Sequence, residues 1–165
     1  KKVAPEAAAL ARYRILAVKD LVPACTVASM LRTLCNAWTT TGGFFGPTAA
    51  CPFGCGLLEA DRFAHFLGCS SLRDLWQEVF PGAAPFLQQL SLETTTLTAA
   101  MLSTNEVVQT IIWTDVVGQC LNEARASNPA LVIHGLVGKN MIIARLRFLG
   151  VHCDATRIAI RSMKA

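Results

Sequence analysis

Three cysteines and one histidine lie close together in the sequence, at a spacing that suits a metal ion. Cys51 and Cys55 are separated by three residues, nine residues follow, and His65 and Cys69 are again separated by three. Three thiolates and one imidazole form the soft, tetrahedral ligand set that zinc prefers. Because protein side chains fill all four positions of such a site, the sequence predicts a structural Zn²⁺ ion rather than a catalytic one.

Two local features predict how these four residues come together. Pro52, Gly54 and Gly56 allow the chain around the first cysteine pair to fold into a tight turn. His65 and Cys69 are four positions apart, so on a helix both side chains point the same way. The alternative interpretation is three unrelated buried cysteines and a histidine that bind no metal.

Apolar residues recur at helical spacing along most of the 165 residues, so we predict a mainly α fold, a multi-helix domain built around one Cys3His zinc knuckle. Its predicted parts are a helical pair over 1–40, the zinc knuckle and the following helix over 41–82, and a helical region over 83–165. Helices are expected over 5–21, 24–38 and 62–68, from Ser70 or Ser71 up to Pro81, and over 86–90, 92–102, 106–126, 131–149 and 155–164.

The same periodicity predicts the buried face of each helix. The expected apolar face of the second helix contains Val27, Met30, Leu31, Leu34, Cys35 and Trp38. The long helix, capped by Thr104 or Asn105, is expected to bury Val107 or Val108, Ile111 or Ile112, Val116, Cys120 and Leu121. Arg12, Arg14 and Arg32 are placed on or near the exposed sides of the first two helices.

Seven cysteines, an odd number, and no recognisable signal peptide favour a reducing, intracellular compartment over a disulfide scaffold. The cysteines outside the metal set, Cys25, Cys35, Cys120 and Cys153, lie on apolar-patterned stretches and are expected to be buried thiols. We expect no transmembrane segment, because no window reaches 18 uninterrupted apolar residues. A composition of 53% hydrophobic and 16% charged residues favours a chain that packs against another protein or domain.

The charge is unevenly distributed along the chain. Residues 1–36 carry six basic and two acidic side chains, residues 37–138 carry three and eight, and residues 139–165 carry six and one. Two basic ends therefore flank an acidic middle, which suits contact with a polyanion; solvated helix faces are the alternative. The candidate phosphate contacts are Lys139, Arg145, Arg147, Arg157, Arg161 and Lys164, together with Arg12, Arg14 and Arg32.

We find no pattern that predicts catalysis or a small-molecule substrate. The glycine clusters lack the lysine and spacing of a phosphate-binding loop, and there is no serine elbow. His134 has no evident partner, and the sequence neighbours His152 and Cys153 do not establish a catalytic dyad. The chain is therefore predicted not to be an enzyme.

The run from Cys51 to Gly56, followed by His65, Cys69 and the Leu75-Trp76 pair, resembles a known segment. This is the cysteine/histidine region C-terminal to the reverse transcriptase of LINE-class (non-LTR) retrotransposons. The upstream stretch 31–38 is similar to the arginine- and tryptophan-bearing helix that precedes that region, and the likeness covers about residues 31–80. It implies that Cys51, Cys55, His65 and Cys69 are metal ligands and that Leu75 and Trp76 pack together.

In that family, the segment is thought to help hold template RNA or target DNA. The Tyr-x-Asp-Asp type motif of the polymerase is missing here, so the resemblance implies a retroelement-derived chain without polymerase activity, located in the nucleus. Our first hypothesis is therefore a zinc-stabilised module that binds the RNA or DNA backbone through its basic ends. The alternative is a structural or accessory subunit packed among the protein subunits of a larger assembly, with no nucleic-acid role.

Overall fold

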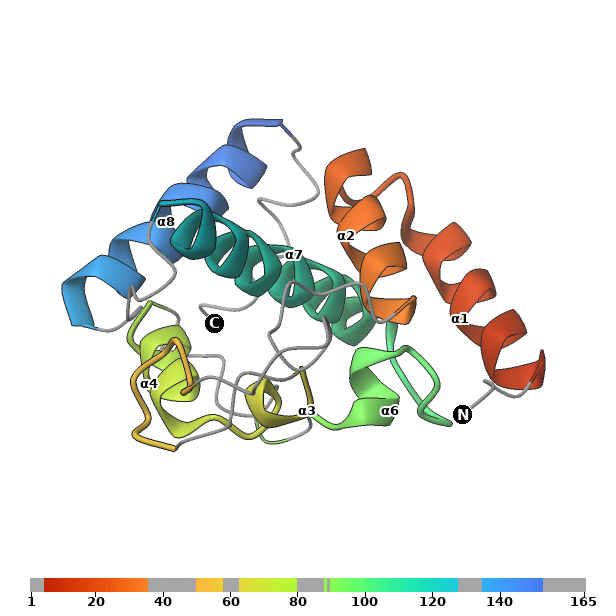
Figure 1. The fold of residues 1–165 in the computed structure, drawn as a ribbon. Helices are drawn as coiled ribbons and strands as arrows, with labels where there is room; N and C mark the ends of the chain where they lie inside the picture. Colours follow the sequence, from red (N-terminus) through yellow and green to blue (C-terminus); the bar gives the residue numbers. More distant parts are fainter. Residues whose placement is uncertain are drawn as a thin grey trace.

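The computed structural model shows a mainly helical protein, as predicted, and contains no strand among the residues that it describes (Figure 1). These residues are 5–35, 50–57, 63–79, 88, 90–127 and 135–152. Predicted features outside them are Trp38, His134, Cys153 and the last helix with Arg157, Arg161 and Lys164.

The described helices form a cluster around one long central helix (Figure 1). They are α1 (Pro5–Val18), α2 (Ala24–Leu34), α3 (Phe63–Phe66), α4 (Ser70–Val79), α6 (Leu92–Thr95), α7 (Thr104–Ser127) and α8 (Gly135–His152). α1 and α2 both end before their predicted limits, and α8 extends beyond its predicted end to His152.

Helix α7 is the centre of the fold. It is buried on every side over most of its length, because α1, α2, α6 and α8 all pack against it. The predicted apolar face is confirmed in Val107, Ile111, Val116 and their neighbours, and Trp113 is also fully buried. A helix enclosed in this way has no solvated face, so its polar residues need partners inside the protein.

Helix α2 meets α7 with a different face from the one predicted. Thr26, Ser29, Met30 and Thr33 are buried against the core, whereas Leu31 is 50% exposed. The prediction that Leu31 and Cys35 belong to the buried face is therefore wrong, although Met30 is buried as predicted. The reason lies on α7, which presents polar groups to α2.

Asp115 of α7 explains this preference. Its carboxylate is fully buried and accepts a 2.5 Å hydrogen bond from the Ser29 hydroxyl of α2. Arg145 of α8 donates to the same carboxylate through Nε (2.7 Å) and Nη2 (3.1 Å). The resulting polar contact, which we call the Asp115 seam, joins three helices, because a buried carboxylate must be both paired and hydrogen-bonded.

Arg14 is buried, not exposed as predicted. Its side chain is 8% exposed and crosses from α1 to the segment after α6, where Nη1 donates to the carbonyls of Leu97 and Ala99, both at 2.7 Å. Nη2 donates to Ala100 at 3.2 Å. Three carbonyl groups that lack helical partners are thereby satisfied.

The segment between α6 and α7 also departs from the predicted helix over 92–102. α6 ends at Thr95, and Leu97 adopts a φ of 59°, a left-handed conformation that an α-helix does not allow. α7 is then capped by Ser103 rather than by Thr104 or Asn105. The Ser103 N–H donates to Glu106 Oε2 at 2.7 Å, and the Glu106 N–H donates back to Ser103 Oγ at 3.3 Å, forming a capping box.

Helices α4 and α8 pack against each other and connect the segment with the Cys3His residues to the bundle. Leu72, Leu75 and Trp76 of α4 are buried, as predicted. α8 buries Ile142 and Leu146 and packs against both α4 and α7. The hydrophobic core includes residues from all three predicted parts of the chain.

The cysteines outside the metal set do not share one environment. Cys25 and Cys35 are exposed, so the prediction that they are buried thiols is wrong. Cys120 is buried as predicted, and burial raises the pKa of its thiol to about 12. Cys153 lies outside the described residues.

Among the helices that the structure describes, none combines the length and apolar character needed to cross a bilayer.

The Asp115 seam leads to a first prediction. Arg145→Ala removes the cation while Asp115 stays fully buried, so we expect a loss of about 3–5 kcal/mol in the free energy of unfolding. Urea denaturation followed by circular dichroism measures this change. Arg147→Ala, an exposed position on the same helix, is the matched control and should shift the free energy by less than about 0.5 kcal/mol. Equal effects of the two substitutions would contradict a structural role for the seam.

Candidate metal centre

The first two ligands lie in a short loop whose shape depends on glycine. The Gly54 N–H donates to the Cys51 carbonyl at 3.0 Å, and the Cys51 N–H donates to the Leu57 carbonyl at 3.2 Å, closing the loop. Gly54 and Gly56 have φ values of 71° and 79°, which favour glycine over any residue with a Cβ. The loop therefore turns Cys51 and Cys55 toward the same point.

The second pair of ligands lies on either side of a turn rather than on one helix. α3 ends at Phe66, and Cys69 stands immediately before α4, so His65 and Cys69 do not share a continuous helix. The Gly68 N–H donates to the His65 carbonyl at 3.0 Å, which turns the chain between them. At the start of α4, the Leu72 N–H donates to the Cys69 sulfur and favours its thiolate form.

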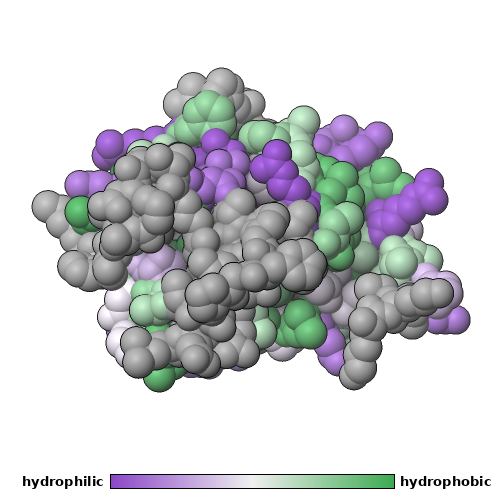
Figure 2. Space-filling model, viewed as in Figure 1, coloured by the Kyte–Doolittle hydropathy of each residue, from purple (hydrophilic) through white to green (hydrophobic). Residues whose placement is uncertain are grey.

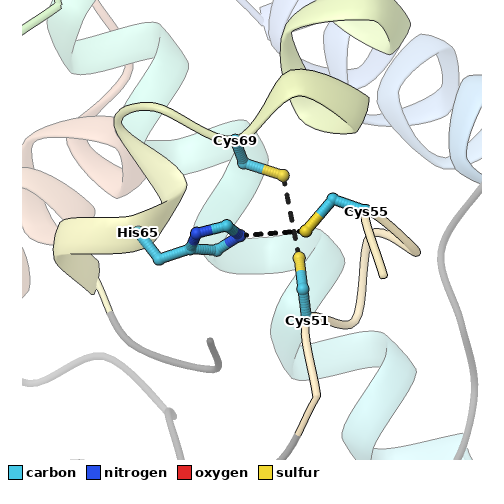
Figure 3. Close-up of side chains that lie close together, drawn as sticks. All are labelled: Cys51, Cys55, His65 and Cys69. Atoms are coloured by element: carbon cyan, nitrogen blue, oxygen red, sulfur yellow. Dashed lines mark hydrogen bonds between the residues drawn. The ribbon is translucent and has the colours of Figure 1, made fainter. Parts of the chain in front are cut away.

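The four predicted ligands converge in the structure (Figure 3). Their ligand atoms all lie within 4.8 Å of one another. Cys51 Sγ is 3.7 Å from Cys69 Sγ, and Cys55 Sγ is 3.3 Å from His65 Nε2. A tetrahedral ion with metal–sulfur bonds of about 2.3 Å and a metal–nitrogen bond of about 2.0 Å separates two sulfurs by about 3.8 Å and a sulfur from a nitrogen by about 3.5 Å. The Cys51–Cys69 and Cys55–His65 separations are close to these values, and the four atoms as a set are somewhat more widely spaced, within 4.8 Å.

Two phenylalanines support the four ligands from the protein interior. Phe53 lies between the two loop cysteines and Phe66 follows His65, and both are fully buried. Their rings meet edge to face, with centroids 5.5 Å apart and an interplanar angle of 84°. Each ligand pair thus contributes one aromatic ring to a shared hydrophobic contact, which is worth about 0.5–1.5 kcal/mol beyond the area that it buries.

Cys51 and Cys69 are buried, whereas Cys55 and His65 are half-buried, so the cluster has an inner and an outer side. On the inner side, the pKa of Cys51 is raised because its thiol hydrogen-bonds to Cys69 and because it is buried. The pKa of Cys69 is lowered because its sulfur accepts that hydrogen bond. The short contact between the two sulfurs thus has opposite effects on their pKa values, and a metal ion bound here would require both as thiolates.

The arrangement can hold one metal ion in a closed shell. Three sulfurs and one nitrogen satisfy a tetrahedral ion fully and leave no position for a substrate or an activated water molecule. Such a site stabilises structure by joining the loop at Cys51–Leu57 to α3 and α4. The Phe53–Phe66 contact was not predicted, although a phenylalanine between two ligands, where a turn usually carries a polar residue, was a usable signal.

Several predicted phosphate contacts have partners within the protein. Arg145 is bound to Asp115, and Arg14 is bound to backbone carbonyls. Lys139 forms an ion pair with Glu78, linking α8 to α4. The Arg145 guanidinium also lies 4.7 Å from the centre of the Phe148 ring. These side chains contribute to the fold, which composition and charge distribution alone do not reveal.

Arg12, Arg32 and Arg147 are exposed, and they come from three different helices, α1, α2 and α8. These three side chains are exposed on the described surface and have no role in the Asp115 seam or the metal cluster. Arg157, Arg161 and Lys164 lie outside the described residues, and their predicted role stays a prediction.

No protein-family model, curated protein sequence or solved structure matches this chain. The resemblance to the retrotransposon segment thus rests on the spacing of its own residues.

Removing one ligand provides a second prediction. Cys55→Ser should abolish stoichiometric metal binding and lower the melting temperature by roughly 10 °C, because a few kcal/mol of folding energy comes from the metal. Elemental analysis and thermal denaturation measure the two effects. Cys35→Ser, an exposed thiol outside the cluster, is the matched control and should retain the metal. Metal affinity should also fall with decreasing pH, because protons compete for the sulfurs.

If Cys55→Ser retained as much metal as Cys35→Ser, the four converging side chains would be an ordinary buried contact rather than a metal centre.

Proposed function

We propose that this chain is a non-catalytic module whose fold is stabilised by zinc. The observation that carries the proposal is the convergence of three sulfurs and one imidazole nitrogen at nearly tetrahedral separations. Thiolate-rich tetrahedral sites favour zinc over hard ions such as Mg²⁺ and Ca²⁺. The closed ligand set supports a structural role.

The identity of the metal can be tested directly. We expect one zinc per chain in protein purified without chelators, measured by elemental analysis. Replacement by Co²⁺ should give the strong visible absorption of a tetrahedral thiolate site. Protein that binds Co²⁺ in an octahedral form, or that carries a different metal at full occupancy, would contradict the proposal.

We further propose that the module binds the backbone of RNA or DNA, consistent with a retroelement origin. The resemblance over residues 31–80 supports this function, together with the exposed arginines Arg12, Arg32 and Arg147. Arg157, Arg161 and Lys164 add candidate charges near the end of the sequence. Contacts of this kind neutralise phosphates and provide little base selectivity.

Salt dependence tests the nucleic-acid proposal. Six phosphate contacts predict that the logarithm of the association constant falls against the logarithm of salt concentration with a slope of about −4 for single-stranded RNA. Arg147→Gln should make this slope shallower by about 0.7. Fluorescence anisotropy with a labelled 20-nucleotide RNA, between 50 and 200 mM salt, measures both quantities.

Arg73→Gln, an exposed position on α4 outside the proposed contact set, is the control for loss of one positive charge. The proposal fails if binding is absent at 50 mM salt, if the slope is flat, or if both substitutions change it equally.

The second candidate function is that of a structural subunit within a larger protein assembly. One observation favours it: large hydrophobic side chains on the described surface, among them Met101, which is 90% exposed, and Tyr13, which is 70% exposed. Side chains of this kind are stabilised by contact with another protein. The two functions are compatible, since a nucleic-acid-binding module can also be one part of an assembly.

A further inference from the structure

An apolar groove of about 600 Å³ lies between α1 and α2 and is closed at one side by α6. Both helices pack on α7, and they make few contacts with each other. Its lining runs along α1 from Ala7 and ends at Lys19, just beyond the helix, a length of about 18 Å at 1.5 Å per residue. Figure 2 shows hydrophobic side chains interleaved with strongly hydrophilic ones over the region of α1 and α2.

The wall of the groove on α2 is the hydrophobic stripe of that helix. Val27, Leu31 and Leu34 recur at spacings of four and three and all line the groove. They have this position because the opposite, polar face of α2 is bound to α7 through the Asp115 seam. A stripe with this spacing usually packs against another helix, and within the described residues no helix covers it.

The wall on α1 is shaped for close approach by a helix. Ala8 and Ala11 are small, while Ile15 and the half-exposed Leu16 continue the apolar surface along the same side. Arg14 fixes α1 to the segment after α6 by three hydrogen bonds to backbone carbonyls. The groove is therefore preformed, which lowers the entropic cost of binding.

Charges at the groove indicate the chemistry of its occupant. The charged residues that line it are Arg12, Lys19 and Glu93, and the exposed Arg32 follows Leu31 on α2. Two of the three lining charges are positive and belong to α1 and its end, so a helix seated between α1 and α2 would meet a net positive charge beside α1. Acidic residues there would be complementary, and basic residues would be repelled.

We propose that the groove binds an amphipathic α-helix of another protein, with apolar anchors at i, i+4 and i+7 and acidic residues beside them. The length of the lining corresponds to about three helical turns, as in other helix-in-groove interfaces. The proposal names a partner class for the second candidate function and does not depend on nucleic-acid binding.

The test uses the complete 165-residue chain and a labelled synthetic probe. The probe is an 18-residue helical peptide with leucines at i, i+4 and i+7, glutamates on both flanks and alanines elsewhere. A second peptide carries lysine in place of each glutamate. Fluorescence anisotropy should show at least about tenfold tighter binding of the acidic peptide at 100 mM salt.

Substitutions in the chain locate the site. Leu31→Glu should weaken binding of the acidic peptide about tenfold or more, since it places a charge on the apolar wall. Met101→Glu, an exposed apolar position outside the groove lining, is the matched control and should leave binding unchanged. Arg12→Glu with Lys19→Glu should reverse the preference between the two peptides. Circular dichroism melting confirms that each variant is folded.

Other outcomes would overturn the proposal. Absence of binding at 1 mM peptide, or equal loss in Leu31→Glu and Met101→Glu, would exclude an acidic helix from this groove. A dimer seen by light scattering that Leu31→Glu dissociates would make a second copy of the chain the occupant. If subunits co-purify with the chain and stay bound to the Leu31→Glu variant, the groove is not their binding site. That result would still support the second candidate function, a structural subunit of an assembly.

Discussion

The burial of α7 on all sides is the constraint on which the rest of the structure depends. A helix without a solvated face must satisfy its polar groups inside the protein, and Asp115 does so through Ser29 and Arg145. That single carboxylate determines which face of α2 packs on α7, and it binds the guanidinium of Arg145 from α8. The choice of face on α2 then decides which hydrophobic residues reach the surface. The pairing of one buried carboxylate thus decides which apolar side chains are exposed on a helix more than 80 residues away in the sequence.

The Cys3His cluster and the basic residues have separate places in this molecule. The Cys3His cluster joins the loop at Cys51–Leu57, α3 and α4, and the Phe53–Phe66 contact supports it from inside. The basic residues divide into two groups: Arg14, Lys139 and Arg145 have partners within the protein, while others are exposed. The net charge of +4 therefore overstates the positive charge that the described surface offers to a partner, because several basic side chains are already bound within the protein.

Local spacing made part of the structure predictable. The Cys3His set was predictable because its residue types and separations are those that a metal ion requires. The long helix α7 was predictable because apolar residues recur at helical spacing over most of its length. The face of α2 could not be predicted, because Thr26, Ser29 and Thr33 resemble a solvated face until Asp115 is known to lie opposite. The burial of Arg14 could not be predicted either, because its hydrogen-bond acceptors are carbonyls 83 to 86 residues away in the sequence. The left-handed turn beside them occurs at Leu97, where no glycine marks it in the sequence.

The separations of these contacts along the chain differ greatly. Cys51 and Cys69 are 18 residues apart, whereas Ser29 and Asp115 are 86 apart. Loop-closure entropy grows with the logarithm of separation, so the longer connection costs about 1 kcal/mol more to form. The ligand segment can therefore become ordered while the helices around α7 are still unassembled. During synthesis, a metal ion would find its complete ligand set well before the residue that orients α2 has been added to the chain.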